Sequence, residues 1–142
     1  MSYRIMTQEN IELLIKDLCA RLPFNNHLVE YKDEKYNVLG IAHGRLVLCK
    51  PFMSYTLNEH PLVEDVKPYL FPLSSITDEQ ERELSKLGVS YGEYALHDDI
   101  RGLGIMVDEA YIFFEFCYKH HIDFLGLIEK GLAIDARGLN IY

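Results

Sequence analysis

The sequence predicts an α+β domain in which a small curled antiparallel sheet of three to five strands packs against two long helices. Two stretches, residues 7–22 and 108–119, repeat apolar side chains at helical spacing, and residues 28–50 carry short apolar and aromatic runs separated by turn residues. An outer acidic helix and a short helix near the C-terminus complete the prediction. The composition, 49% apolar and 25% charged, is typical of a globular domain, and no repeat or linker divides it. We therefore expect one domain over residues 1–142.

The first helix is expected to begin after Thr7, whose hydroxyl can accept a hydrogen bond from a free amide of the first turn. Pro23 ends the helical pattern. The apolar side chains between them recur every three or four residues and predict one buried face: Ile11, Leu14, Ile15, Leu18, Cys19 and Leu22.

Three short runs, 28–32, 36–42 and 45–50, predict an antiparallel meander with turns at 33–35 and 43–44. Gly40 inside the second run indicates a bulge. The third run is apolar on both faces, so its strand is expected to be covered on each side.

The stretch from Pro51 to Pro72 holds four of the five prolines and is expected to be irregular, with one edge strand over 53–57. Thr77 and Gln80 fit a capping box that begins an acidic helix closed by Gly88. In that helix we expect Leu84 and Leu87 to be the anchors.

A loop and a short strand over 103–107 are expected to precede the last long helix, with Asp108 as its cap. Its main apolar stripe is predicted to consist of Ala110, Phe113, Phe114 and Cys117. Residues 123–131 then predict a short helix that begins at Asp123 and ends at Gly131, and the apolar residues 132–134 are expected to dock back.

The charge balance excludes some function classes. Fourteen basic and twenty-two acidic residues give a net charge of −8, which argues against direct nucleic-acid binding and leaves an acidic nucleic-acid mimic as an alternative.

The three cysteines, Cys19, Cys49 and Cys117, are too far apart for a disulfide framework and are expected to be reduced core thiols. No signal peptide or membrane span is recognised, so we expect a cytoplasmic protein without a membrane partner.

Histidine and aspartate side chains could form a metal site. Six residues are the candidate ligands: His97, Asp98, Asp99, His120, His121 and Asp123. The spacing argues against such a site, because adjacent histidines on a helix point about 100° apart. Imidazoles at a helix C-terminus are better explained by the negative end of the helix dipole. We therefore predict neither a metal nor a cofactor.

Catalytic motifs are missing from the sequence as well. His97 with Asp98 could supply a general base and its orienting carboxylate, which keeps an acid–base or metal-dependent enzyme as an alternative, but no nucleophile motif accompanies them. Gly102 and Gly104 lack the third glycine of a dinucleotide loop. No catalytic residue is predicted.

The ten tyrosines and seven phenylalanines exceed what the predicted helix stripes use. Aromatic side chains are enriched at protein–protein interfaces. Four of the surplus aromatics are the predicted protein-binding residues: Tyr69, Phe71, Tyr91 and Tyr94.

Residues 67–77 (KPYLFPLSSIT) and 120–133 (HHIDFLGLIEKGLA) resemble a family of small uncharacterised proteins from gut bacteria and their phages or integrated elements. That family carries KPYLRP-SSMT before an acidic helix and H-FDY-GLI-KGLA near the C-terminus. This chain departs from it at Phe71 and Leu125, where arginine is common in the family. The resemblance implies a phage or mobile-element origin and cytoplasmic use, and it brings no activity or catalytic residues.

These observations lead to one hypothesis: a non-catalytic accessory protein of phage or mobile-element type that acts by binding another protein. The absence of a catalytic motif, the surplus of aromatics and the acidity support it. The partner is not identified by the sequence, and self-association into a homo-oligomer is a further option.

Overall fold

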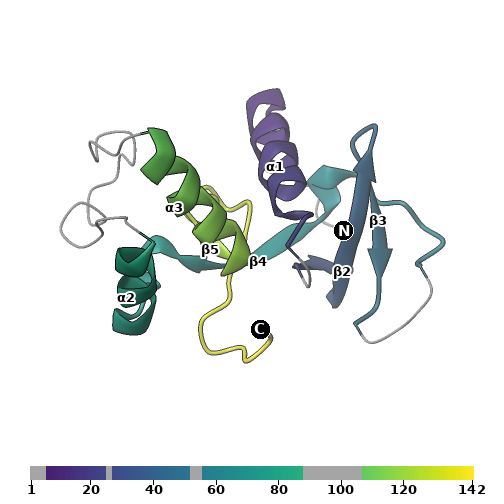
Figure 1. The fold of residues 1–142 in the computed structure, drawn as a ribbon. Helices are drawn as coiled ribbons and strands as arrows, with labels where there is room; N and C mark the ends of the chain where they lie inside the picture. Colours follow the sequence, from purple (N-terminus) through teal and green to yellow (C-terminus); the bar gives the residue numbers. More distant parts are fainter. Residues whose placement is uncertain (1–5, 25–26, 52–55, 88–106) are drawn as a thin grey trace.

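The computed structural model describes residues 6–24, 27–51, 56–87 and 107–142, with the backbone alone for 107–110. Figure 1 shows the helices α2 and α3 on one side, the strands β2 and β3 on the other, and β4 running between them. The elements in chain order are α1 (Gln8–Arg21), β1 (Leu28–Tyr31), β2 (Glu34–Ala42), β3 (Arg45–Cys49), η1 (Val63–Asp65), β4 (Lys67–Pro72), η2 (Leu73–Ser75), α2 (Asp78–Lys86), α3 (Val107–Lys119), β5 (Ile122–Asp123) and β6 (Ile134–Asp135).

The sheet is mixed. Its strand order is β3-β2-β1-β4-β5, with β6 also paired to β4. The pairs among β1, β2, β3 and β4 are antiparallel, whereas β5 and β6 run parallel to β4. The predicted α+β class is confirmed, and the prediction of a wholly antiparallel sheet is wrong. Parallel pairing needs a long crossover, and the stretch from β4 to β5, which contains α2 and α3, supplies one.

The hairpins follow from their turn residues. Lys32 and Asp33 have φ of 50° and 64°, and His43 and Gly44 have φ of 54° and 72°, as two-residue hairpins require. The second turn confirms the prediction, while the first begins one residue earlier than expected because β2 already starts at Glu34. The register between β2 and β3 shifts between Val38 and Gly40, which confirms the bulge.

The position of β4 corrects the prediction of an irregular proline-rich stretch. Lys67–Pro72 is a strand with neighbours on both sides, although it contains Pro68 and Pro72. The two prolines stand near its ends, so the amide of Phe71 remains free to donate to the His121 carbonyl at 2.8 Å. Of the predicted edge strand 53–57, only Thr56 and Leu57 are described, and Thr56 forms an isolated bridge with Cys49.

Helix α1 begins as predicted, because Thr7 Oγ1 accepts a hydrogen bond from the Asn10 amide at 3.1 Å. Its buried face is rotated relative to the predicted one. Leu14 and Leu18 are fully buried, together with the charged Asp17 and Arg21. Cys19 is exposed, so the prediction that it is a core thiol is wrong. The rotation brings two charged side chains into the interior.

Helix α2 begins with the predicted capping box, in which Thr77 and Gln80 exchange hydrogen bonds of 3.0 and 3.1 Å. Leu84 is fully buried, but Leu87 is 50% exposed and does not anchor the helix as predicted. The predicted end at Gly88 lies outside the described residues.

Helix α3 contains Val107, so its start precedes the predicted cap Asp108, whose side chain is not described. The predicted strand 103–107 has only Val107 among the described residues. Phe113 and Cys117 are buried as predicted, whereas Phe114 is only partly buried.

The predicted helix over 123–131 is a series of turns. Asp123 still caps them, because its carboxylate accepts hydrogen bonds from the amides of Leu127 and Ile128, each at 2.9 Å. Gly126 and Gly131 both have φ of 74°, and the left-handed conformation of Gly126 prevents a regular helix. After Gly131 the chain docks on β4 as β6.

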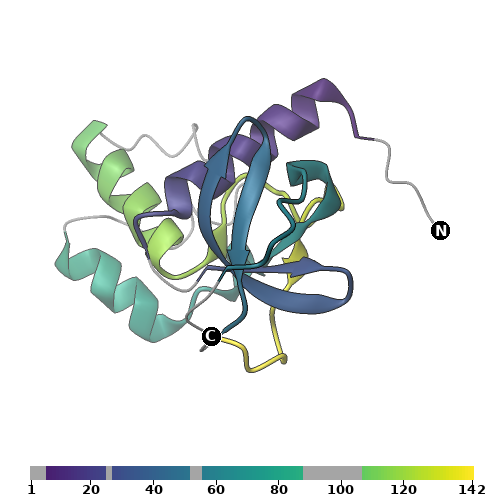
Figure 2. The ribbon, with the colours of Figure 1, turned by 90° about the vertical axis from the view of Figure 1, so that its right-hand side faces the viewer.

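Three apolar clusters make up the core. The first joins Leu14 and Leu18 of α1 to the strands, including Leu70 of β4, and the second joins α2, α3 and β5. The third lies around Tyr69 and the chain end. Figure 2, in which the β2–β3 side faces the viewer, shows α1 crossing the strands. Within the described ranges, every helix is too short or too polar to span a bilayer.

Candidate functional site

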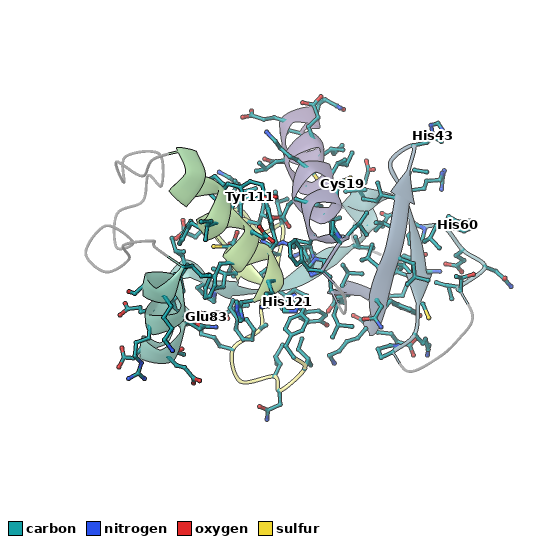
Figure 3. The ribbon with its side chains drawn as sticks, in the orientation of Figure 1. Cys19, His43, His60, Glu83, Tyr111 and His121 are labelled. Atoms are coloured by element: carbon teal, nitrogen blue, oxygen red, sulfur yellow. The ribbon has the colours of Figure 1, made fainter. Side chains whose placement is uncertain are left out.

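An open groove lies between the C-terminal end of α1 and one face of α3, and we call it the α1–α3 groove. Its volume is about 550 Å³. The residues that line it are Ala20, Pro23, Phe24, Tyr111, Phe114, Glu115 and Tyr118. Tyr111 projects from α3 on the side toward α1 (Figure 3) and is 70% exposed. A large aromatic side chain with this exposure is the kind of group that marks a binding surface.

Two other rings of the groove, Phe114 and Tyr118, pack against Phe124. Phe114 stacks on Phe124 with 4.8 Å between ring centroids, and Tyr118 meets the edge of Phe124 at 5.3 Å. Phe24 on the opposite wall lies 6.3 Å from Tyr118. These contacts hold the aromatic walls open to solvent, so the groove exists before any partner binds.

Beneath the groove, a buried ion pair ties α1 to α3 and β5. Arg21 and Asp17 have fully buried side chains and form a bidentate pair at 2.9 and 3.0 Å. Arg21 also donates to the carbonyls of Ile122 at 2.7 Å and Cys117 at 3.3 Å, and its guanidinium lies 5.3 Å from the ring centroid of Tyr118. Arg21 therefore links α1 to the backbone at the end of α3 and to one ring of the groove.

Asp17 and Arg21 stabilise each other's charged state. Burial raises the pKa of the Asp17 carboxyl, and the neighbouring Arg21 guanidinium opposes that rise. Burial also raises the pKa of the Cys117 thiol, which keeps it protonated. Neither the Asp17 carboxyl nor the Cys117 thiol has the lowered pKa of a nucleophile or the solvent access of a general base. The Asp17–Arg21 ion pair is therefore structural.

A second polar group is a stack of three rings, His27, His121 and Tyr142, which we call the histidine–tyrosine stack. The two histidines are buried, whereas Tyr142 is 41% exposed. The His121 ring lies 3.6 Å from the Tyr142 ring and 5.7 Å from the His27 ring, with interplanar angles of 9° in both cases. Neither nitrogen of His27 nor Nδ1 of His121 has a hydrogen-bond partner among the described residues. Burial lowers the pKa of His27 well below its usual value and that of His121 to about 4.

The described candidate metal ligands do not converge. His121 belongs to the histidine–tyrosine stack, while Asp123 is occupied by two amides. His120 points to α2, where its Nε2 lies 3.2 Å from Glu83 Oε2. His97, Asp98 and Asp99 lie outside the described residues, and within the described part of the chain no group of three or more potential ligands could hold a metal ion.

A larger and more polar groove runs along α2, with a volume of about 710 Å³. Its lining residues are Thr77, Glu79, Gln80, Arg82, Glu83, Lys86 and His120. Thr77 and Gln80 are occupied by the capping box, and Glu83 pairs with His120. Acidic and basic side chains alternate there, so this groove lacks the single sign of charge that would select a charged ligand.

The structure separates the predicted protein-binding aromatics. Tyr69 is buried in the core at 5% exposure, so it does not belong to a surface patch, and Phe71 is partly buried against Tyr142. Tyr91 and Tyr94 lie outside the described residues.

Sequence reasoning missed the residues of the α1–α3 groove. Tyr111, Phe114 and Tyr118 recur at spacings of three and four, which indicates a second aromatic face on α3 beside the buried one. Comparisons of this chain with protein-family models, with curated proteins and with solved structures found nothing that matches it.

Proposed function

We propose that this protein is a binding module whose α1–α3 groove receives a segment of a partner protein. The observation that carries the proposal is the exposed Tyr111 beside a preformed aromatic groove. Tyrosine supplies a large contact area at little cost in conformational entropy, and it is enriched among the residues that dominate binding energies.

The chemistry of the groove favours a particular kind of partner. Glu115 is the charged residue among the described groove residues, and the whole chain carries a net charge of −8. A segment that inserts an aliphatic or aromatic side chain between the rings and places lysine or arginine near Glu115 would complement both features. We therefore propose a short basic and apolar segment as the occupant.

The wider role that we propose is that of an accessory factor. Its assignment to a phage or mobile element and to the cytoplasm rests on the family resemblance of residues 67–77 and 120–133. Among the described residues no catalytic or metal-binding cluster competes with the groove as the functional site.

The proposal is tested by selecting binders from a library of random 12-residue peptides displayed on a surface, followed by affinity measurements. Enriched peptides should combine an apolar anchor with lysine or arginine. Replacing Tyr111 with alanine should weaken their binding by about 30-fold, the usual effect of removing a central tyrosine. Leu39→Ala is the matched control, because Leu39 is 55% exposed on β2 and does not line the groove.

Two results would overturn the proposal. The first is a selection that yields peptides bound equally well by the Tyr111→Ala variant. The second is self-association, measured by sedimentation, that Tyr111→Ala abolishes, since a second copy of the chain would then occupy the groove.

A further inference from the structure

The chain end is attached to the rest of the protein by the partly exposed side chain of Tyr142. Residues 137–142 follow β6, and we call them the C-terminal strap. The Tyr142 hydroxyl accepts a hydrogen bond from the Leu28 amide at 3.0 Å and donates one to the Tyr69 carbonyl at 2.9 Å. Its ring covers His121 at 3.6 Å. The strap is thus held by β1, by β4 and by one imidazole.

The rest of the strap contributes weaker anchors. Ile141 is partly buried against the third apolar cluster, and Leu139 is 45% exposed. The Arg137 guanidinium pairs with Asp135 of β6, only two residues before it in the sequence, so this ion pair does not attach the strap to a distant element. Tyr142 is therefore the main attachment of the strap, and its contact with His121 decides whether it stays docked.

His121 is held in a state that a proton would disrupt. It is 9% exposed, its backbone has φ of 60°, and its Nδ1 has no acceptor among the described residues. An imidazolium there would be buried with an unpaired N–H and would face the Arg21 cation. If the Tyr142 ring left the stack, the charged imidazole of His121 would gain access to water.

We propose that His121 makes the C-terminal strap acid-sensitive, so that protonation of its imidazole releases Tyr142 from the stack and undocks residues 137–142. The released strap uncovers the Leu28 amide and the Tyr69 carbonyl, both of which Tyr142 occupies at neutral pH. This inference is independent of the α1–α3 groove, since no residue of the strap lines that groove.

The other ionisable groups around the histidine–tyrosine stack do not act as the acid-sensitive group that releases the strap. They come from every element packed against it: Asp17 and Arg21 of α1, Cys117 of α3, His120, Asp123 of β5, Tyr69 of β4, and His27. Arg21 stays charged, and burial raises the pKa values of Cys117, Tyr69 and Tyr142, so these three remain neutral in acid. The His27 ring lies 5.7 Å from the His121 ring, and its protonation would add to the same repulsion.

One attraction opposes release. An imidazolium stacked on a tyrosine ring gains a cation–π contact, which is worth roughly tenfold in an equilibrium constant. The pKa of His121 is lowered from 6.5 to about 4 in the docked state. Burial is the largest cause of this shift, and undocking of Tyr142 would expose the ring to water. Relief of the whole shift would change the equilibrium between docked and undocked strap by about 300-fold, which is the upper bound and exceeds the cation–π attraction.

The test measures how readily carboxypeptidase Y removes Tyr142 from the folded protein at pH 7.5 and pH 5.5. The rate is divided by that for a synthetic peptide of residues 137–142, which corrects for the enzyme's own pH profile. The corrected rate should rise about tenfold at pH 5.5, because the undocked His121 regains its ordinary pKa. A corrected rate that does not change with pH would overturn the proposal.

Two variants separate His121 from its neighbour. His121→Asn cannot be protonated in this range, and asparagine tolerates the left-handed backbone of this position, so its corrected rate should differ by less than about twofold between the two pH values. His120→Asn is the matched control, because His120 contacts Glu83 instead of Tyr142, and it should keep the tenfold rise. A tenfold rise that persists in His121→Asn would contradict the proposal.

A second measurement remains available if His121→Asn does not fold. The titration of the His121 ring can be followed by nuclear magnetic resonance in the native chain and in Tyr142→Ala. It should titrate below pH 5 in the native chain and close to pH 6.5 in Tyr142→Ala. Equal titration in both chains would show that docking of Tyr142 is not coupled to the proton on His121.

Discussion

Arg21 and His27 lie in the same buried region but differ in their hydrogen bonding. Arg21 is 0% exposed, and its guanidinium donates to Asp17 and to the carbonyls of Cys117 and Ile122. His27 is 3% exposed, and neither of its ring nitrogens has a partner among the described residues. A buried arginine cannot lose its proton, so it needs partners, whereas a buried imidazole can become neutral instead.

This difference distinguishes structural from responsive polar groups. The Asp17–Arg21 pair satisfies its polar atoms by direct contact and joins α1 to α3 and β5. The histidine–tyrosine stack is stable only while its imidazoles are neutral. We expect the first group to dominate the free energy of unfolding and the second to dominate its dependence on pH.

The largest effect is expected from Asp17→Ala, which leaves the Arg21 guanidinium buried with part of its donors unpaired. It should lower the free energy of unfolding by about 3 to 5 kcal/mol, as measured by urea denaturation. The double variant Asp17→Leu with Arg21→Met should lose less than Asp17→Ala alone, because it buries no unpaired charge. A loss below about 1 kcal/mol for Asp17→Ala would show that Arg21 is not held as described.

The next largest effect is the dependence of stability on pH. His27 and His121 have lowered pKa values in the folded protein, so the unfolded chain binds protons first as the pH falls. Stability is therefore fully present above pH 6.5 and declines as the pH falls toward 4, by about 2 kcal/mol for His121 between pH 7.5 and 5, and His27 adds to the decline in the same direction.

His27→Phe checks this prediction, because phenylalanine keeps a ring in the stack and cannot be protonated. Its unfolding free energy should fall less steeply between pH 7.5 and 5 than that of the native chain. Asp17 acts in the opposite direction, because burial raises its pKa and the folded state takes up that proton first. An unchanged slope in His27→Phe would exclude His27 as one of the groups that titrate.

A smaller effect is expected from Tyr142→Phe, which keeps the ring on His121 and removes the hydroxyl that bonds to Leu28 and Tyr69. The loss should be about 1 kcal/mol at pH 7.5, the usual contribution of such hydrogen bonds, and it should be no larger at pH 5.5, where the proposed undocking of the strap already breaks them. Thermal unfolding at the two pH values measures both quantities. A loss that grows at pH 5.5 would contradict the proposed release of the strap.

The smallest effect is expected from His120→Gln. This imidazole adjoins His121 in sequence but lies near the surface, beside Glu83 of α2. A partly exposed ion pair contributes about 0 to 1 kcal/mol, so the free energy of unfolding should change by less than 1 kcal/mol. A larger loss in urea denaturation would show that the contact between α2 and α3 depends on His120 more than the geometry indicates.

The local sequence signals that were confirmed share one property. The cap at Thr7, the capping box of Thr77 with Gln80, the turn at His43–Gly44 and the cap at Asp123 all join residues within five positions of one another. Their hydrogen bonds depend on the local backbone alone, so the residue types are sufficient to predict them.

The candidate site depended on long-range contacts that residue types do not reveal. Arg21 looks like a surface cation that complements a helix C-terminus, yet it donates to carbonyls about one hundred residues away in the sequence. His121 is one of six candidate ligands of a metal site that the sequence argues against, and its actual partners, His27 and Tyr142, come from other segments. The α1–α3 groove likewise requires two helices to meet.

The sequence by itself determined the α+β class, the hairpin of β2 and β3 and the N-terminal caps of α1 and α2, because each follows from local conformational preference or from hydrophobic periodicity. Tertiary structure decided that β4 joins both parts of the sheet, that the face of α1 bearing Asp17 and Arg21 is buried, and that His121 stacks on Tyr142. Those outcomes depend on which distant groups satisfy one another's hydrogen bonds and exclude water, and only the folded chain brings these groups together.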